Sequence, residues 1–213
     1  MPKQTYNNFA DKKYEQQTKS AFNDVRSLLT KADATVVKML NNDVRLDMRA
    51  ENRRFNTWFG GTTAIDLNHV QTRLHTMLRQ LSSIDTTLTN DPASNDVAYM
   101  HVAPGQNFGT QAANYTDAQA PALVANPTIF IGKAFYKAPL LGKDSQVGTI
   151  IHELSHIVCS TEDVPNPAGG AYADGFFDTY GETNCKWLAA NHPQQAQQNA
   201  DNYLFYCCTF DIR

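Results

Sequence analysis

The pentapeptide HELSH, which runs from His152 to His156, constrains this chain more than any other feature. On a helix, positions i and i+4 lie on the same face, so the two imidazoles can reach one metal ion. Zinc favours imidazole ligands, and a catalytic zinc site keeps one coordination position open for water. Glu153 can take a proton from that water, which is the arrangement of a metalloprotease. The pattern predicts one catalytic Zn²⁺, with His152 and His156 as metal ligands and Glu153 as general base.

The residues around the pentapeptide indicate the helix that this chemistry needs. Apolar side chains recur at helical spacing at Val147, Ile150, Ile151, Leu154, Ile157 and Val158. Such a stripe is typical of an amphipathic helix with a buried back. Asp144 or Ser145 can cap its first turn.

Length and charge limit the classes of protein to consider. At 213 residues and 42% hydrophobic content, the chain can form one domain with a buried core. We expect residues 1–54 to be its N-terminal helical part and residues 55–213 its catalytic part. The formal net charge of −3 argues against a nucleic-acid partner. No window is apolar enough to insert into a membrane, and residues 1–8 lack the apolar stretch of a signal peptide.

Hydrophobic periodicity predicts further helices. Apolar residues recur at steps of three and four over 14–42 and over 64–82, and a last helical region covers roughly 181–206. Between the first two lies a charged stretch, 45–54, to which no element is assigned. Residues 164–175 are rich in proline and glycine and are read as a turn-rich excursion.

The middle of the chain predicts a small sheet. Residues 97–102 and 128–131 are short β-rich runs, separated by a polar loop at 104–121, and His101 is interpreted as a structural histidine. The strand near 128–131 is expected to be an edge that pairs with an extended substrate. The predicted fold class is α+β: a helix-rich, zincin-like metalloprotease domain with a small β-sheet beside the HExxH helix.

The cysteines do not suggest a disulfide scaffold. Four are present, at positions 159, 185, 207 and 208, and none has the spacing of a structural zinc site. Buried thiols are therefore favoured over a bridge.

A third metal ligand must come from residues downstream of His156. The candidates are Glu162, Asp163, Asp174, Asp178, Glu182 and His192. A metzincin continuation would place a third histidine six residues after His156, and this chain has a different sequence there.

The run Ser160-Thr161-Glu162-Asp163 resembles the aspzincin family, the deuterolysins and peptidyl-Lys metalloendopeptidases. Their signature is HExxH followed by GTxDxxYG, with the aspartate as third ligand. Segments 55–60, 144–149 and 199–203 are similar to other elements of the family, so the resemblance covers about residues 55–206.

The resemblance implies that Asp163 is the third zinc ligand and that the Tyr180 hydroxyl stabilises the oxyanion. Two features depart from the family pattern. Ser160 stands where glycine is usual, and the excursion separates Asp163 from Tyr180, which normally follows three residues later. Asp178 is the competing ligand because it lies beside Tyr180, and Tyr172 is the weaker oxyanion candidate.

The resemblance also bears on substrate preference. The family binds a lysine through two acidic residues of its late helix. Asp201 occupies the first of these positions and is predicted to bind substrate, but the second is Leu204. Strict lysine specificity is therefore not expected, which leaves open a looser preference for basic residues or a different preference. Asp201 could instead be a partner of another site residue or a solvated helix residue.

Together these features predict a zinc-dependent endopeptidase that acts on proteins or peptides. The alternatives are a zinc hydrolase of a non-protein amide, such as one in a cell wall, and a catalytically silent binding domain, which the intact Glu153 disfavours. A toxin or effector exported by a specialised route fits the N-terminus, and so does a mature domain cut from a longer precursor.

Overall fold

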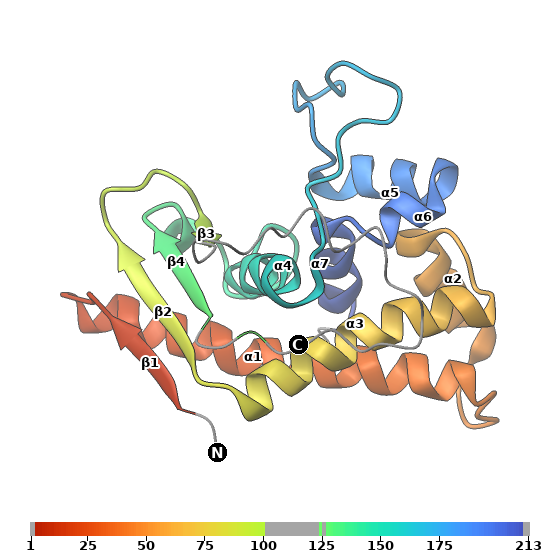
Figure 1. Ribbon diagram of the computed structural model, residues 1–213, viewed down its shortest axis with the longest axis horizontal. Coiled ribbons are helices and arrows are strands. Elements are labelled where there is room, and N and C mark those ends of the chain that lie inside the picture. Colours follow the sequence, from red (N-terminus) through yellow and green to blue (C-terminus); the bar gives the residue numbers. More distant parts are fainter. Residues whose placement is uncertain (1–2, 101–123, 125–126, 211–213) are drawn as a thin grey trace.

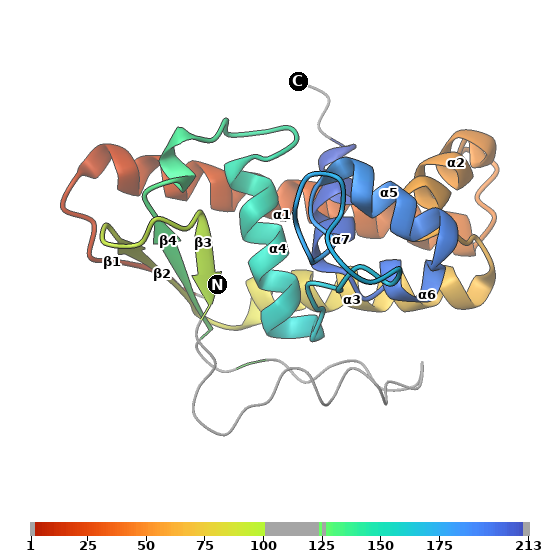
Figure 2. The same ribbon diagram turned by 90° about the horizontal axis from the view of Figure 1, so that it is seen from above.

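The computed structural model describes residues 3–100, 124 and 127–210, which form two regions around a central helix, α4 (Figure 1). The sheet lies at one end of the molecule, and helices α2, α5 and α6 lie at the other (Figure 2). The predicted loop at 104–121 and His101 fall outside the described residues.

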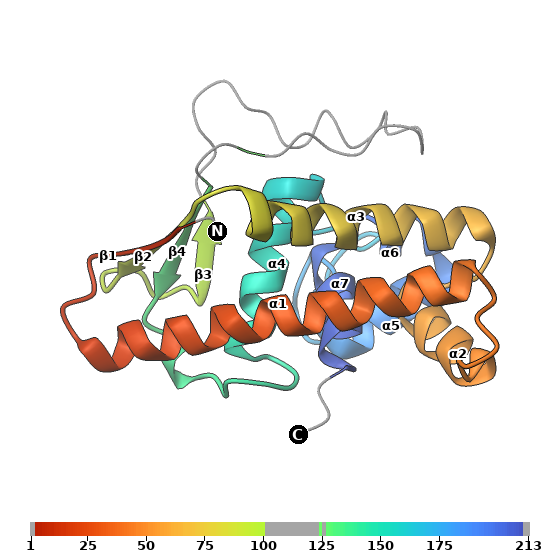
Figure 3. The same cartoon turned by 90° about the horizontal axis from the view of Figure 1, so that it is seen from below.

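Two long helices run side by side along the base of the molecule (Figure 3). They are α1 (Lys12–Leu40) and α3 (Ala64–Ser83), which confirms the helices predicted at 14–42 and 64–82. A capping box between Thr63 and Asp66 begins α3, since each side chain accepts a hydrogen bond from the other residue's backbone. The buried faces of α1 and α3 join one core with residues of α4.

Helix α2 (Met48–Phe59) was not predicted, because its first turns fall in the charged stretch. Its buried side chains, Phe55, Trp58 and Phe59, gather in the last two turns. Gly60 ends the helix with φ +71°, and a Cβ there would lie 1.9 Å from the Ala189 carbonyl oxygen of α5. Glycine is therefore required both by the backbone conformation and by the close approach of two helices.

The sheet has the order β1-β2-β4-β3. Its strands are β1 (Gln4–Asn7), β2 (Thr86–Asp91), β3 (Ala98–Met100) and β4 (Thr128–Gly132). Strand β2 pairs in parallel with β1 and β4, with Gln4 opposite Thr86 and Thr87 opposite Thr128. Strand β3 pairs antiparallel with β4.

Strands β3 and β4 confirm the two predicted β-runs as far as they are described, whereas β1 and β2 were missed. The expectation that residues 128–131 form an edge is wrong, because β4 is bonded on both sides. Among the described residues, β3 is the edge on the side of α4. Pairing of an extended substrate must therefore be considered at β3.

Helix α4 (Gln146–Cys159) carries the HELSH segment and begins where predicted, with the Ser145 side chain accepting from the Gly148 backbone at 3.0 Å. It packs against α1, α3, β3 and the late helix α7 (Ala200–Cys208). A Cβ at Gly148 would lie 2.9 Å from Cγ of Leu204. The glycine thus lets α4 and α7 pack closely, which brings Asp201 within reach of His152.

The predicted helical region at 181–206 is observed as three helices. Helices α5 (Gly181–Asn191) and α6 (Pro193–Ala196) precede α7, and a 3₁₀ turn, η2 (Phe135–Lys137), precedes α4. The expected buried thiols are observed at Cys159, Cys185 and Cys207. No helix in the described ranges is long and apolar enough to cross a membrane.

Candidate metal centre

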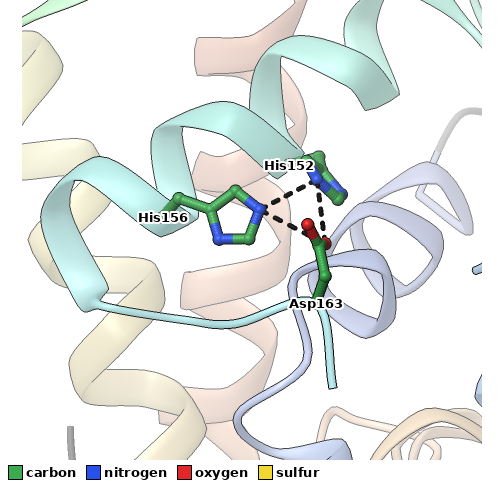
Figure 4. Close-up of side chains that lie close together, drawn as sticks. All are labelled: His152, His156 and Asp163. Carbon is green, nitrogen blue, oxygen red and sulfur yellow. Dashed lines mark hydrogen bonds and ion pairs between the residues drawn. The ribbon is translucent and has the colours of Figure 1, made fainter. Parts of the chain in front are cut away.

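Three side chains meet beside the C-terminal half of α4 (Figure 4). The Nε2 atoms of His152 and His156 lie 2.9 Å apart, and Oδ1 of Asp163 lies 3.3 and 3.4 Å from them. One ligand atom from each residue fits within a span of 4.8 Å. Two imidazoles and a carboxylate match the donor set of a catalytic zinc site with three protein ligands.

The outer nitrogen of each imidazole is engaged by a group that accepts a proton. Nδ1 of His152 lies 2.7 Å from Oδ1 of Asp201, and Nδ1 of His156 lies 2.7 Å from the Thr161 carbonyl oxygen. A carbonyl oxygen can only accept, so the neutral His156 ring carries its proton on Nδ1 and presents a lone pair at Nε2. With Asp201 bonded to Nδ1, neutral His152 does the same. Two lone pairs 2.9 Å apart beside a carboxylate fit a cation between them.

Electrostatics in the metal-free chain agree with a site that attracts positive charge. Burial alone would lower the pKa of His152, but the hydrogen bond and charge of Asp201 outweigh it and raise the pKa to about 9. The pKa of Asp163 is lowered: burial opposes ionisation, but the neighbouring imidazoles of His156 and His152 favour it. Burial raises the pKa of Glu153, which makes it a stronger base than an exposed glutamate.

The chain turns sharply after α4 to bring Asp163 back to the histidines. Ser160 has φ +50°, a left-handed conformation that ends the helix where the family usually has glycine. The Thr161 hydroxyl then lies 2.7 Å from Ser155 Oγ, and the Glu162 backbone forms hydrogen bonds with residues 198 and 200 at the start of α7. Asp163 is therefore held between the end of α4 and the start of α7.

The excursion after Asp163 is a hairpin with a closed base, which we call the 164–179 hairpin. Its two stems pair at Pro165 and Asp178, and the Thr179 backbone amide donates to the Val164 carbonyl at 2.7 Å. Asn199 holds both stems, since its side chain accepts from the Val164 amide at 3.0 Å and donates to the Thr179 carbonyl at 3.1 Å. The hairpin projects from the body of the molecule (Figure 1).

The closed base brings the two ends of the hairpin together despite their separation in sequence. Tyr180 lies near enough to Asp163 for the two side chains to influence each other's ionisation. Burial, followed by the charge of Asp163, raises the pKa of Tyr180 well above its usual value, so its hydroxyl keeps its proton at neutral pH. The rings of Tyr180 and His152 lie 6.3 Å apart.

The other downstream candidates lie outside the cluster formed by the described residues. Asp178 is on the opposite stem, paired with Pro165. Asp174 accepts from Asn184, and Glu182 pairs with two lysines. Tyr172 hydrogen-bonds to Thr179 at 2.8 Å instead of joining Tyr180 beside Asp163.

Asp201 was predicted to bind substrate, and its geometry favours the alternative that it supports another site residue. The side chain is buried, with 7% of its surface exposed. Oδ1 contacts His152, and Oδ2 accepts from the Gly181 backbone amide at 2.9 Å. Both oxygens are thus engaged within the protein, on α4 and on the N-terminus of α5.

A cleft of about 800 Å³ opens over the cluster. Its walls include residues 95–100 of the β3 segment together with the side chains of Glu153, Asp163, Phe176 and Tyr180. Glu153 reaches the cleft from the same helix as the two histidines. The general-base candidate, the oxyanion candidate and the metal cluster therefore share one open space.

A family model described as lysine-specific metallo-endopeptidase matches residues 46–208 of the chain. This chain belongs to the aspzincin family. The family-model match covers α2 through α7, including the whole of the site.

Curated relatives and a solved structure agree with this assignment. The aspzincin is 33% identical over 162 residues to a peptidyl-Lys metalloendopeptidase of Armillaria mellea, and 27% identical over 165 residues to an extracellular protease of Aeromonas hydrophila. Each match covers 74% of this chain, but only 35% and 36% of the relative, so the chain spans about a third of their length. A zinc peptidase of Grifola frondosa shares the fold, with TM-score 0.59, 24% identity, and 93% and 96% of the two chains covered.

Aspzincins are zinc metalloendopeptidases, and the described part of this aspzincin offers His152, His156 and Asp163 as a set that could hold the ion. Two supporting residues were missed by the sequence analysis. They are Thr161, whose carbonyl orients His156, and Asn199, which ties the hairpin stems to α7. Both residues lie in segments that resemble the family, at 160–163 and 199–203, and this resemblance was the sequence signal that could have identified them.

Proposed function

We propose that this aspzincin hydrolyses peptide bonds as a zinc-dependent endopeptidase, with Glu153 as general base. The observation that carries the proposal is the convergence of two imidazole lone pairs and the Asp163 carboxylate in an open cleft that Glu153 and Tyr180 also line. Zinc, when bound, supplies a Lewis acid that polarises a carbonyl and makes water more acidic.

In this proposal each residue has one task. His152, His156 and Asp163 hold the ion. Glu153 accepts a proton from the attacking water and returns it to the leaving amine, and its raised pKa suits both transfers. Tyr180, protonated at neutral pH, donates a hydrogen bond to the oxygen that becomes negative as the carbonyl is attacked.

The substrate in this proposal is an extended protein or peptide segment. The edge of β3 and its flanking residues line the cleft, so an extended chain can add to the sheet there. The Armillaria relative is named for cleavage at lysine. Because Asp201 is engaged by His152 and Gly181, and Leu204 supplies no charge, we do not propose strict lysine specificity for this chain.

We further propose that residues 1–54 and 55–213 act as one peptidase domain, since α1 and α4 share a core. Export is also a proposal, supported by the Aeromonas relative, which is named an extracellular protease.

The test is a casein and peptide digest of zinc-loaded protein, with and without a chelator, beside Glu153→Gln. The wild type should cleave, and the chelator should abolish cleavage. Glu153→Gln should keep its zinc and lose ~10²–10⁴ in kcat. A zinc-loaded wild type that cleaves no polypeptide would overturn the proposal and favour a non-protein amide substrate or a binding role.

Zinc content of Asp163→Ala and Asp178→Ala decides the third ligand. We expect the first variant to lose zinc and the second to retain it. Retention by Asp163→Ala with loss by Asp178→Ala would reverse the assignment.

A further inference from the structure

Phe176, near the end of the 164–179 hairpin, stands at the junction of two hollows in the cleft. Its side chain is 54% exposed and packs edge-on against Tyr180, with ring centroids 5.7 Å apart. It lines the hollow over the metal cluster and also a second hollow of about 410 Å³. Glu153 and Tyr180 are shared by both hollows as well, so Phe176 lies beside the groups that would act on the substrate.

The hairpin holds Phe176 in place through several contacts. Asp174 accepts from the Phe176 backbone amide at 3.2 Å and from the Asn184 side chain on α5 at 2.8 Å. Tyr172 donates its backbone amide to the Phe176 carbonyl at 2.7 Å, and its ring packs edge-on against Trp187 of α5. The phenyl ring is thus presented by a segment anchored to a helix, which reduces the entropy lost when a substrate binds.

The second hollow has an apolar part to its lining. Leu204 and Ala138 line it together with Val97 and Ala98 of the β3 segment. Two of its carboxylates, Asp201 and Asp174, are already hydrogen-bonded within the protein. Asp144 is exposed, at the N-terminal end of α4. An apolar side chain placed in this hollow would therefore not deprive Asp201 or Asp174 of a hydrogen-bond partner.

We propose that Phe176 divides the cleft into two subsites and that the hollow it shares with Leu204 receives a bulky apolar side chain of the substrate. This inference rests on the proposed peptidase function and names the residue that selects the substrate. A peptide that crosses Glu153 and Tyr180 would place side chains on both sides of Phe176. The phenyl ring would then contact the side chain in the second hollow directly.

The experiment compares Phe176→Ala with Phe177→Ala on a peptide library, with cleavage sites identified by mass spectrometry. Phe177 is a matched control because it is the next residue of the same hairpin, is 69% exposed and lines neither hollow. The wild type should prefer a leucine, methionine or phenylalanine at one position beside the cleaved bond. Phe176→Ala should lower kcat/KM for such peptides about 10- to 100-fold, flatten the preference and retain zinc. Phe177→Ala should stay within about twofold of the wild type on that scale.

Three results would overturn the inference. They are a wild-type preference for lysine or arginine at every position that shows selection, an unchanged preference in Phe176→Ala, and an equal loss in Phe177→Ala. If the wild type cleaves library peptides and Phe176→Ala has the same cleavage preference and kcat/KM, the peptidase function stands and only this inference fails. If the zinc-loaded wild type cleaves nothing, both fail.

Discussion

Replacing Asp201 by asparagine tests how the protein sets the metal affinity of His152. The carboxylate accepts two hydrogen bonds, from His152 Nδ1 at 2.7 Å and from the Gly181 amide at 2.9 Å. Asparagine has one carbonyl oxygen and one amino group, so it can accept from only one of these donors and must turn N–H groups toward the other. The change removes one buried hydrogen bond and creates a donor–donor contact with little change in volume.

We expect Asp201→Asn to weaken zinc binding ~10–100-fold, or about 1.4–2.8 kcal/mol, the usual cost of losing a partner that orients a histidine ligand. The effect should depend on pH. Protons compete with zinc at His152, whose pKa of about 9 depends on Asp201, and the variant lowers that pKa. At pH 6.5 protons therefore weaken zinc binding more in the wild type than in the variant, which partly offsets the variant's loss. The loss in zinc affinity relative to the wild type should be larger at pH 8.5 than at pH 6.5.

The assay is zinc titration against a competing chelator at both pH values, with Asp178→Asn as the control. Asp178 lies on the hairpin stem outside the metal cluster, so its variant should bind zinc within about twofold of the wild type. Zinc affinity of Asp201→Asn equal to that of the control at pH 8.5, or a relative loss that grows as the pH falls, would refute the reasoning.

Tyr180→Phe should retain zinc and lose ~10²–10³ in kcat, and an unchanged kcat would contradict the oxyanion role. In metal-free protein, the raised pKa of His152 stabilises the fold fully below pH 6.5, and this contribution is lost as the pH rises through about 9. Urea denaturation should show that loss in the wild type and much less of it in Asp201→Asn. Gly60→Ala should lower the free energy of unfolding by more than ~2 kcal/mol, because the added Cβ would lie 1.9 Å from a carbonyl oxygen. Gly170→Ala should lower it by only about 1 kcal/mol, because Gly170 has φ +73° but open space around it. Equal losses in the two variants would contradict the predicted clash at Gly60.

Features that depend on local periodicity were predictable from the sequence. The long helices and α4 show apolar stripes at helical spacing, and Ser145 provides the cap expected there. Helix α2 was missed because its polar first turns carry no stripe. Its anchors are three aromatic residues near its end, and the cap of Asp47 and the left-handed Gly60 were the signals to combine.

Features that depend on distant pairing were not predictable. Strand β1 pairs with β2 across about 80 residues, and both are polar segments. The same limit applied to the site. The HELSH segment indicated two ligand candidates, but the meeting of Asp163 with Tyr180 depends on the pairing of Pro165 with Asp178, and no local pattern encodes that pairing.

The closed base of the 164–179 hairpin has a consequence for how such a chain can vary. Because backbone pairing and Asn199 fix both stems, residues between them can be inserted or deleted without changing the separation of Asp163 and Tyr180. Loop closure is inexpensive to extend, at about 0.6 kcal/mol for each doubling of loop length. The stems therefore form a graft point, at which new recognition surfaces can evolve or be engineered while the hydrolytic residues stay in register.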